Sequence, residues 1–226
     1  MIALHPLTGP ESLMPLGPET NDVEITKTEA KRIVLTSDTH TKAPDGSDFP
    51  QNILEACRGA DLIVHLGHIG SPGLLDRLGT VAKTLACRTN LDDMTFGPLL
   101  QAEIQSGRTS SYVRLLEAGK FSIGCFQDPT KRGIGKIVNE TRLAFPDGPV
   151  REVLKTKFGR VPDVVAFANT HHPQILLREG VLFVNPGSPN YPGDWRKGGA
   201  GTLARLDLTG DTVEAEIIDL ARPPPG

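Results

Sequence analysis

The amino-acid sequence predicts an α/β fold in which two β-sheets pack face to face and the helices lie outside them. Strand and helix patterns alternate through the first half, which indicates a largely parallel sheet with crossover helices. Short strand patterns separated by turn residues fill the second half, which indicates antiparallel hairpins. With 226 residues and 38% apolar side chains, the chain suits one domain around a single core.

Short apolar runs and amphipathic segments mark the elements of the first half. Residues 32–36 read Arg-Ile-Val-Leu-Thr, an apolar run with β-branched residues that is typical of a buried strand. Similar runs predict strands at 61–65 and 81–87. Amphipathic segments at 50–58 and 73–78 predict the helices that connect these strands.

The second half combines strand patterns with one long polar segment. Residues 127–148 are rich in Gly, Pro and charged side chains, so a long loop is expected there, followed by a helix at 149–158. Turn residues at 179–180 and 209–211 predict hairpins. The expected strands lie at 110–115, 120–125, 164–168, 174–178, 181–184, 201–208 and 212–218.

The two ends of the chain differ from the region between them. Residues 1–30 contain four prolines and no clear period, which predicts an N-terminal Pro-rich arm that is extended or loosely packed. Residues 222–226 predict a flexible tail. A domain spanning residues 31–221 remains, and the arm is a candidate contact to a second subunit in a homo-oligomer.

Charge and composition exclude several classes of protein. A net charge of -3 and a pI near 6.1 give no reason to expect nucleic acid or an anionic membrane as a partner. No run of 18 apolar residues is present, and the first 20 residues lack the pattern of a secretory signal. Cys57, Cys87 and Cys125 are an odd, scattered set, which argues against a disulfide framework and favours a reducing, cytoplasmic location.

Polar side chains follow the predicted strands at the points where the strands end. Asp38 and His40 follow the first strand, His68 the second, and Asn169 and His171 a strand of the second half. Ligands of open α/β sheets bind beyond the carboxyl ends of the strands, so these side chains are expected at one rim. Imidazole and carboxylate together suit Mn, Zn or Fe better than Mg.

Five short motifs carry a resemblance to a known family. They are Ser37-Asp38-Thr39-His40, His65-Leu66-Gly67-His68, Arg88-Thr89-Asn90-Leu91-Asp92, Asn169-Thr170-His171 and Asn185-Pro186-Gly187-Ser188. In this order they resemble the D-x-H, H-x-G-D, R-G-N-x-D, G-H-T-H and N-P-G-S motifs of calcineurin-like metallophosphoesterases. The resemblance is to the small prokaryotic phosphodiesterase branch, whose fold is shared with a retromer scaffold subunit. It implies a four-layer α-β-β-α sandwich of two mixed sheets with a two-metal cleft.

The departures from these motifs fall mainly on one of the two implied metals. By position, the first metal would take Asp38, His40, His68 and His171, all of which are able to bind. The second would share His68, which replaces the family's bridging aspartate, and would take Asn90. Asn169 would be a poor substitute for one of its histidine ligands, and the other histidine is absent after the strand at 120–125.

The losses favour one divalent metal per chain over two. Two divalent ions about 4 Å apart repel each other by roughly 17 kcal/mol at an effective dielectric constant of 20. The motif positions offer one carboxylate, that of Asp38, to offset this repulsion.

Two functions from different classes remain open. The first is a phosphoesterase, most consistent with a phosphodiesterase, in which the metal activates a water that attacks a small phosphate ester. His68 would act there either as a metal ligand or as an imidazolium that replaces the second metal. Asn90 would orient the phosphate, and Arg88 or Arg196 would clamp its oxygens. The alternative is a catalytically inactive scaffold or ligand-binding protein that keeps the same fold.

Overall fold

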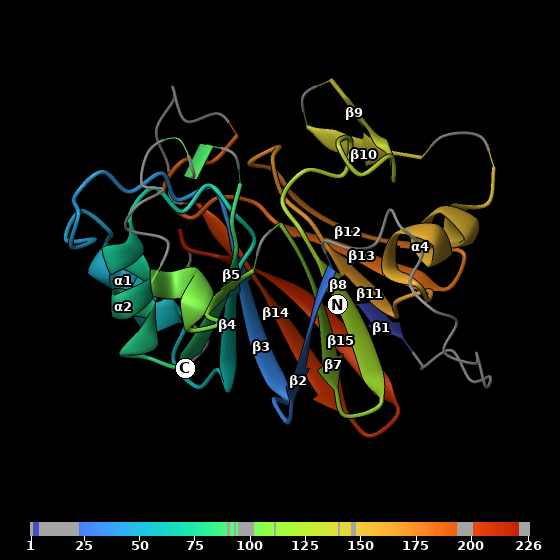
Figure 1. Ribbon diagram of the computed structural model, residues 1–226, viewed down its shortest axis with the longest axis horizontal. Helices are drawn as coiled ribbons and strands as arrows, with labels where there is room; N and C mark the ends of the chain where they lie inside the picture. The colour runs from blue at the N-terminus through green and yellow to red at the C-terminus, as the bar shows by residue number, and fades with distance from the viewer. Residues whose placement is uncertain are drawn as a thin grey trace.

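The computed structural model describes residues 2–4, 23–89, 91–92, 94, 102–110, 112–139, 141–145, 148–193 and 201–221. Two large mixed sheets dominate it (Figure 1). The first has the strand order β1 (Ile2–Leu4), β15 (Thr212–Asp219), β14 (Thr202–Thr209), β3 (Arg32–Thr36), β4 (Leu62–His65), β5 (Lys83–Cys87) and β6 (Thr109–Ser110). The second has the order β12 (Pro173–Arg178), β13 (Val181–Pro186), β11 (Val164–Ala166), β8 (Phe121–Cys125), β7 (Val113–Ala118) and β2 (Val23–Thr28).

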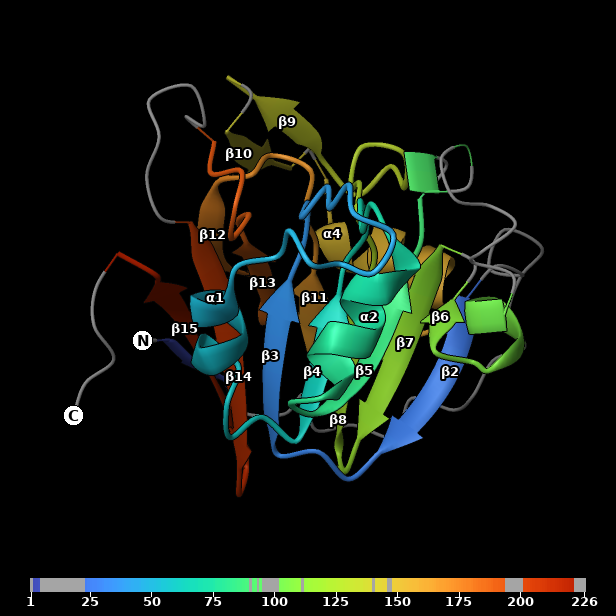
Figure 2. The ribbon, with the colours of Figure 1, turned by 90° about the vertical axis from the view of Figure 1, so that its left-hand side faces the viewer.

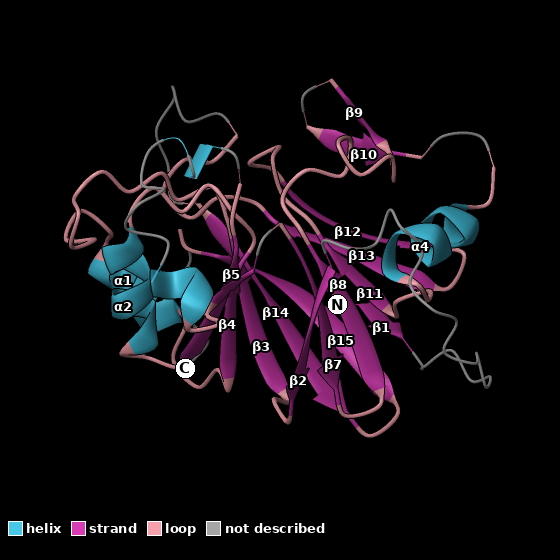
Figure 3. Cartoon of the chain, in the orientation of Figure 1, coloured by secondary structure: helices cyan, strands magenta, loops and turns pink. Residues whose placement is uncertain are grey.

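Three apolar cores separate four layers. The central core packs the inner faces of the two sheets against each other, with Leu35 and Val64 from one sheet and Ile123 and Val184 from the other. The helices α1 (Gln51–Ala56) and α2 (Pro72–Gly79) cover the outer face of the first sheet, and α4 (Val150–Phe158) covers that of the second (Figure 3). The predicted α-β-β-α sandwich of two mixed sheets is therefore confirmed.

The two sheets do not correspond to the two halves of the sequence, contrary to what the strand patterns suggest. The C-terminal hairpin of β14 and β15 does not join the second sheet; β14 pairs antiparallel with β3 and so extends the first sheet. The second sheet contains parallel pairs, because β11 lies between β8 and β13 and runs parallel to both. A hairpin pattern fixes only the pairing of its own two strands, so it does not predict which sheet the hairpin joins.

Two predicted irregular segments contain strands. Residues 23–28, which the sequence assigns to the arm, form β2 and pair in parallel with β7 at the edge of the second sheet. The expected loop at 127–148 contains a small hairpin, β9 (Lys136–Val138) with β10 (Arg142–Ala144). Both segments are short and partly exposed, so they lack the apolar run that marks a buried strand.

The charges in β2 have partners on the neighbouring strand. Glu24 lies 3.0 Å from the guanidinium of the buried Arg114 in β7, and Thr26 accepts a hydrogen bond from the same group. The polar residues Glu24 and Thr26 interrupt the apolar pattern of a strand. The same two residues hold β2 to the sheet through Arg114. Within the predicted arm, residues 2–4 form β1, and residues 5–22 lie outside the described residues, as does the tail 222–226.

The parallel strands bring several loops to one end of the sandwich. The strands β3, β4 and β5 run in the same direction, with α1 and α2 lying in front of them in Figure 2, and the loops that follow them lie at the upper end. The loop after β11 of the second sheet meets this rim, since the amide N–H of Asn169 donates to Asp38. Among the described residues, no helix is both long and apolar enough to cross a membrane.

Candidate metal centre

The loops after β3 and β4 are joined by their backbones. The N–H of Asp38 donates to the carbonyl of Gly67 at 2.9 Å, and the N–H of His40 donates to the carbonyl of His68 at 3.0 Å. Gly67 has a φ of +116°, and a Cβ there would lie 2.6 Å from the Thr89 methyl carbon. The absence of a side chain at Gly67 therefore allows the loop after β4 to lie close to Thr89, which follows β5.

Backbone strain is concentrated at this rim. Seven non-glycine residues among those described have a positive φ, and five of them are Asp38, His40, His68, Asn169 and His171. Each residue held in this left-handed region costs on the order of 1–3 kcal/mol, and such residues cluster at functional sites. The positions that the sequence selects for metal chemistry are thus the positions where the backbone is least relaxed.

Asp92 holds the loop after β4 in place. Its buried carboxylate accepts hydrogen bonds from the backbone N–H groups of His68, Ile69 and Gly70, and from the N–H and hydroxyl of Thr89. Asp92 therefore serves as an anchor for the loops, and it is not one of the three residues whose ligand atoms converge.

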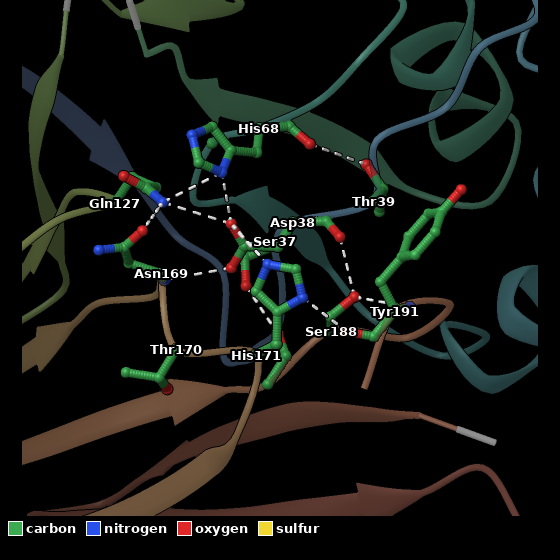
Figure 4. A network of polar contacts seen from close by, with 12 residues as sticks. Ser37, Asp38, Thr39, His68, Gln127, Asn169, Thr170, His171, Ser188 and Tyr191 are labelled. Atoms are coloured by element: carbon green, nitrogen blue, oxygen red, sulfur yellow. Dashed lines mark hydrogen bonds and ion pairs between the residues drawn. The ribbon is translucent and has the colours of Figure 1, made fainter. Parts of the chain in front are cut away.

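The Asn185–Ser188 turn fixes the loop after β3 from the side of the second sheet. The hydroxyl of Ser188 donates to the carbonyl of Asp38 at 2.8 Å, and the hydroxyl of Ser37 donates to the carbonyl of Gly187 at 2.7 Å (Figure 4). Asn190 adds a hydrogen bond to the carbonyl of Thr39. The turn therefore positions Asp38 and His40 without contributing a ligand itself.

Three side chains converge in a geometry that suits a divalent ion. One ligand atom each from Asp38, His40 and His171 lies within 4.8 Å of the others. The Nε2 atom of His171 lies 3.9 Å from Oδ1 of Asp38, and two metal–ligand bonds of about 2.1 Å span up to about 4.2 Å. One carboxylate and two imidazoles form a donor set that suits Zn, Mn or Fe.

The His171 ring is held in the tautomer that a metal requires. Its Nδ1 atom lies 2.6 Å from the backbone carbonyl of Tyr191, which only accepts hydrogen bonds, so Nδ1 carries the proton. In the neutral form of the ring the lone pair is then on Nε2, which faces Asp38. Such a hydrogen bond from the second ring nitrogen is the usual support of a metal-binding histidine.

The protonation states of the other two ligands suit a cation as well. Burial raises the pKa of the Asp38 carboxyl, but the hydrogen bond from His68 and the charges of His171 and His68 outweigh it, and the net pKa lies below its usual value. Burial and the charge of His68 lower the pKa of His40, which favours the neutral imidazole. Asp38 is therefore an anion and His40 a free lone-pair donor at neutral pH.

His68 lies outside the group of three ligand atoms. Its Nδ1 atom is 2.9 Å from Oδ1 of Asp38 and 3.2 Å from the amide nitrogen of Gln127 (Figure 4). This nitrogen is turned toward a carboxylate and an amide, so it does not join His40 and His171. Asn169 is not part of the group either; its side-chain oxygen accepts from Gln127 at 3.0 Å.

The remaining predicted residues are in different places. Arg88 lies above the Tyr112 ring, 5.0 Å from its centroid, and lines a pocket of about 300 Å³ next to the ligand cluster. It is therefore near the cluster but not part of it. The predicted roles of Asn90 and Arg196 concern residues outside those that the structure describes.

Sequence reasoning assigned no role to two residues that build the rim. Gln127 follows β8 as Asp38 follows β3, and this polar residue just after a strand is the signal that would have found it. His65 is fully buried and lies 2.9 Å from the Thr39 hydroxyl, so it supports the Asp38–His40 loop from below. Burial lowers the pKa of His65 to about 3, which keeps this ring neutral.

Comparisons with known proteins bear on the family and the fold. The family model described as a calcineurin-like phosphoesterase superfamily domain matches residues 32–211. A probable metallophosphoesterase of Methanothermobacter thermautotrophicus is 29% identical over 192 residues, covering 84% of this chain and 94% of that protein. A probable metallophosphoesterase of Methanocaldococcus jannaschii is 27% identical over 188 residues, covering 83% of this chain and 81% of that protein. Vps29 of Chaetomium thermophilum shares the fold, with a TM-score of 0.56 at 16% identity over 85% of this chain and 97% of that one.

Proposed function

Because the chain belongs to the calcineurin-like phosphoesterase superfamily, we propose that it is a metal-dependent phosphodiesterase that acts on small phosphodiesters with one divalent ion per chain. The convergence of Asp38, His40 and His171 carries the proposal. Asp38 and His40 follow β3 of the first sheet, and His171 follows β11 of the second, so the candidate ligands come from separate loops. All three residues have a positive φ, which is energetically unfavourable for residues other than glycine. Such strain clusters at functional sites, so it supports the same conclusion.

The chain supplies distinct groups for each part of the reaction. A divalent ion bound by Asp38, His40 and His171 would supply a Lewis acid and lower the pKa of a water molecule toward about 7. The backbone carbonyl of Tyr191 keeps His171 oriented. The Nδ1 atom of His68 is engaged by Asp38, so its Nε2 atom is the ring nitrogen that would exchange a proton with a substrate oxygen.

The surroundings of the cluster support a phosphodiester as the substrate. A pocket of about 340 Å³ is lined by His40 and His68, among others, and the pocket of about 300 Å³ is lined by Gln127 and Arg88. Both pockets adjoin the cluster, and a phosphodiester carries two ester groups that need space on either side of its phosphorus. Lys131 in the second pocket adds a positive charge that favours an anionic substrate.

Metal content and turnover test this proposal together. We expect purified protein loaded with Mn²⁺ to hydrolyse bis(p-nitrophenyl) phosphate faster than p-nitrophenyl phosphate, a monoester with the same leaving group. The Asp38→Ala variant should lose both the bound metal and the activity, whereas the surface variant Asp211→Ala should keep both. Lack of turnover of either ester with Mn²⁺, Zn²⁺ and Fe²⁺ would contradict the proposal.

A non-catalytic binding protein is the second candidate, and one observation favours it. His68 stands at the position where the family places a bridging aspartate, and its Nδ1 atom is hydrogen bonded to Asp38 and lies near Gln127 instead of joining the three ligand atoms. This candidate predicts that the protein binds a divalent ion or a phosphate ester but hydrolyses neither test ester.

A further inference from the structure

The amide nitrogen of Gln127 is surrounded by polar atoms from three other loops. It lies 3.0 Å from Oδ1 of Asn169, 3.3 Å from Oδ1 of Asp38 and 3.2 Å from Nδ1 of His68. These atoms come from the loops after β11, β3 and β4, and Figure 4 shows them arranged around the Gln127 amide. Such a convergence of oxygen and nitrogen atoms resembles the shell around a cation, but an NH₂ group stands at its centre.

The orientation of the Gln127 amide follows from its partners. The ionised Asp38 carboxylate only accepts hydrogen bonds, so the nitrogen of the amide faces it and not the oxygen. The two amide hydrogens serve Asp38 and Asn169. His68 donates its own Nδ1–H to Asp38, from which it is 2.9 Å away. The amide nitrogen of Gln127, the carboxylate of Asp38 and Nδ1 of His68 therefore all have hydrogen-bond partners within the protein.

The position of Gln127 is fixed by its backbone and by its packing. Its carbonyl accepts the N–H of Ala168 at 2.8 Å, which places it beside Asn169. A Cβ on Gly67 would lie 2.9 Å from the Cβ of Gln127. The Gln127 side chain therefore fits beside residue 67 only because that residue is a glycine. Gln127 is only 6% exposed, so its amide cannot turn freely into solvent.

We propose that the Gln127 amide occupies a second cation position and thereby excludes a second divalent ion from the rim. The donor hydrogens point at Asp38 Oδ1 and Asn169 Oδ1, the atoms that a cation at this position would need. A cation there would have to displace the amide and leave a buried NH₂ group without partners, which is unfavourable. This inference deepens the proposed function, since it explains why the centre would hold a single metal.

The test replaces the donor by a ligand of nearly the same shape. In Gln127→Glu a second carboxylate faces Asp38 Oδ1, and two carboxylates this close require a cation or a proton between them. We expect this variant to bind one more equivalent of Mn²⁺ than the wild-type protein in equilibrium dialysis. Its Mn²⁺ electron paramagnetic resonance spectrum should change from that of an isolated ion to that of a coupled pair.

Two further variants control the experiment. Gln51→Glu adds the same charge on the exposed surface of α1, where it should leave the stoichiometry unchanged. Gln127→His introduces a neutral ligand and serves if the Glu variant does not fold, as judged by circular dichroism. The inference is overturned if the folded variants at Gln127 bind no more Mn²⁺ than the wild-type protein. The experiment measures the number of Mn²⁺ ions bound per chain and not turnover. Its result therefore tests this inference independently of hydrolytic activity.

Discussion

The two sides of the Asp38 carboxylate differ in what they offer to a cation. On one side, His40 and His171 present imidazole nitrogens within 4.8 Å of the carboxylate, and the second nitrogen of His171 is held by a backbone carbonyl. On the other side, His68, Gln127 and Asn169 are hydrogen bonded to Asp38 or to each other. The same oxygen of Asp38, Oδ1, lies 3.9 Å from Nε2 of His171 and accepts hydrogen bonds from His68 and Gln127. The comparison teaches that one carboxylate can be shared between a candidate ligand group and hydrogen-bond donors of the protein.

The largest expected effect comes from removing the residue that both sides share. Asp38→Asn keeps the shape of the side chain but removes its negative charge from the centre of the rim. Loss of a group that hydrogen-bonds to a metal ligand lowers metal affinity by about 10–100-fold. Asp38 is a candidate ligand itself, so the Asn variant should lower the affinity for Zn²⁺ by more than about 100-fold. Isothermal titration with Zn²⁺ measures this change. An affinity within a few fold of the wild-type value would show that Asp38 is not a metal ligand.

Two adjacent histidines provide a matched pair for the ligand side. His171 belongs to the ligand group, whereas His172 does not. We expect His171→Gln to lower the affinity for Zn²⁺ by at least about 10-fold, because the imidazole lone pair is lost. His172→Gln should leave the affinity unchanged. Equal effects of the two variants would show that the group of three does not define the site.

The Asp92 anchor separates loop support from ligation. Its carboxylate accepts backbone N–H groups of the loop that carries His68, so Asp92→Asn leaves some of those donors unsatisfied. The expected loss is about 1–3 kcal/mol in the free energy of unfolding, measured with urea on the metal-free protein. Asp48→Asn, an exposed carboxylate with one such contact, should cost less. An Asp92 variant as stable as the wild type would show that the loop does not need this anchor.

The smallest effect concerns the buried ring beneath the ligands. The folded-state pKa of His65 is lowered from 6.5 to about 3, so the unfolded chain binds a proton there that the folded chain does not. The free energy of unfolding of the metal-free protein should therefore fall as the pH drops below 6.5, by about 1.4 kcal/mol per pH unit from this group. His40, whose pKa is also lowered, adds to the fall in the same direction.

The His65→Gln variant isolates the contribution of that ring. Urea unfolding at pH 6.5 and pH 5.5 should show a smaller loss of stability in this variant than in the wild-type protein. The variant is less stable at pH 6.5 if the contact with Thr39 is lost, so the comparison uses the pH dependence and not the absolute value. The same pH dependence in both proteins would show that His65 is not held neutral by the fold.

The sequence predicted the parallel core and the ligand positions because both leave local patterns. The buried run of residues 32–36 and the side chains that follow it are readable without the rest of the chain. The edge strand β2 was missed because its stability depends on Arg114, which lies far away in sequence. Gln127 was missed because its place after β8 marks it only as a candidate for the rim, and its partners lie on loops that are distant in sequence.

The candidate ligands belong to loops of both sheets, and this has a consequence for the folded state as a whole. An ion bound by Asp38 and His40 of the first sheet and by His171 of the second would cross-link the two sheets at this end of the sandwich. By mass action, such an ion at 100 times its dissociation constant adds about 2.7 kcal/mol of stability. The melting temperature of the protein would then report the concentration of free metal in its surroundings.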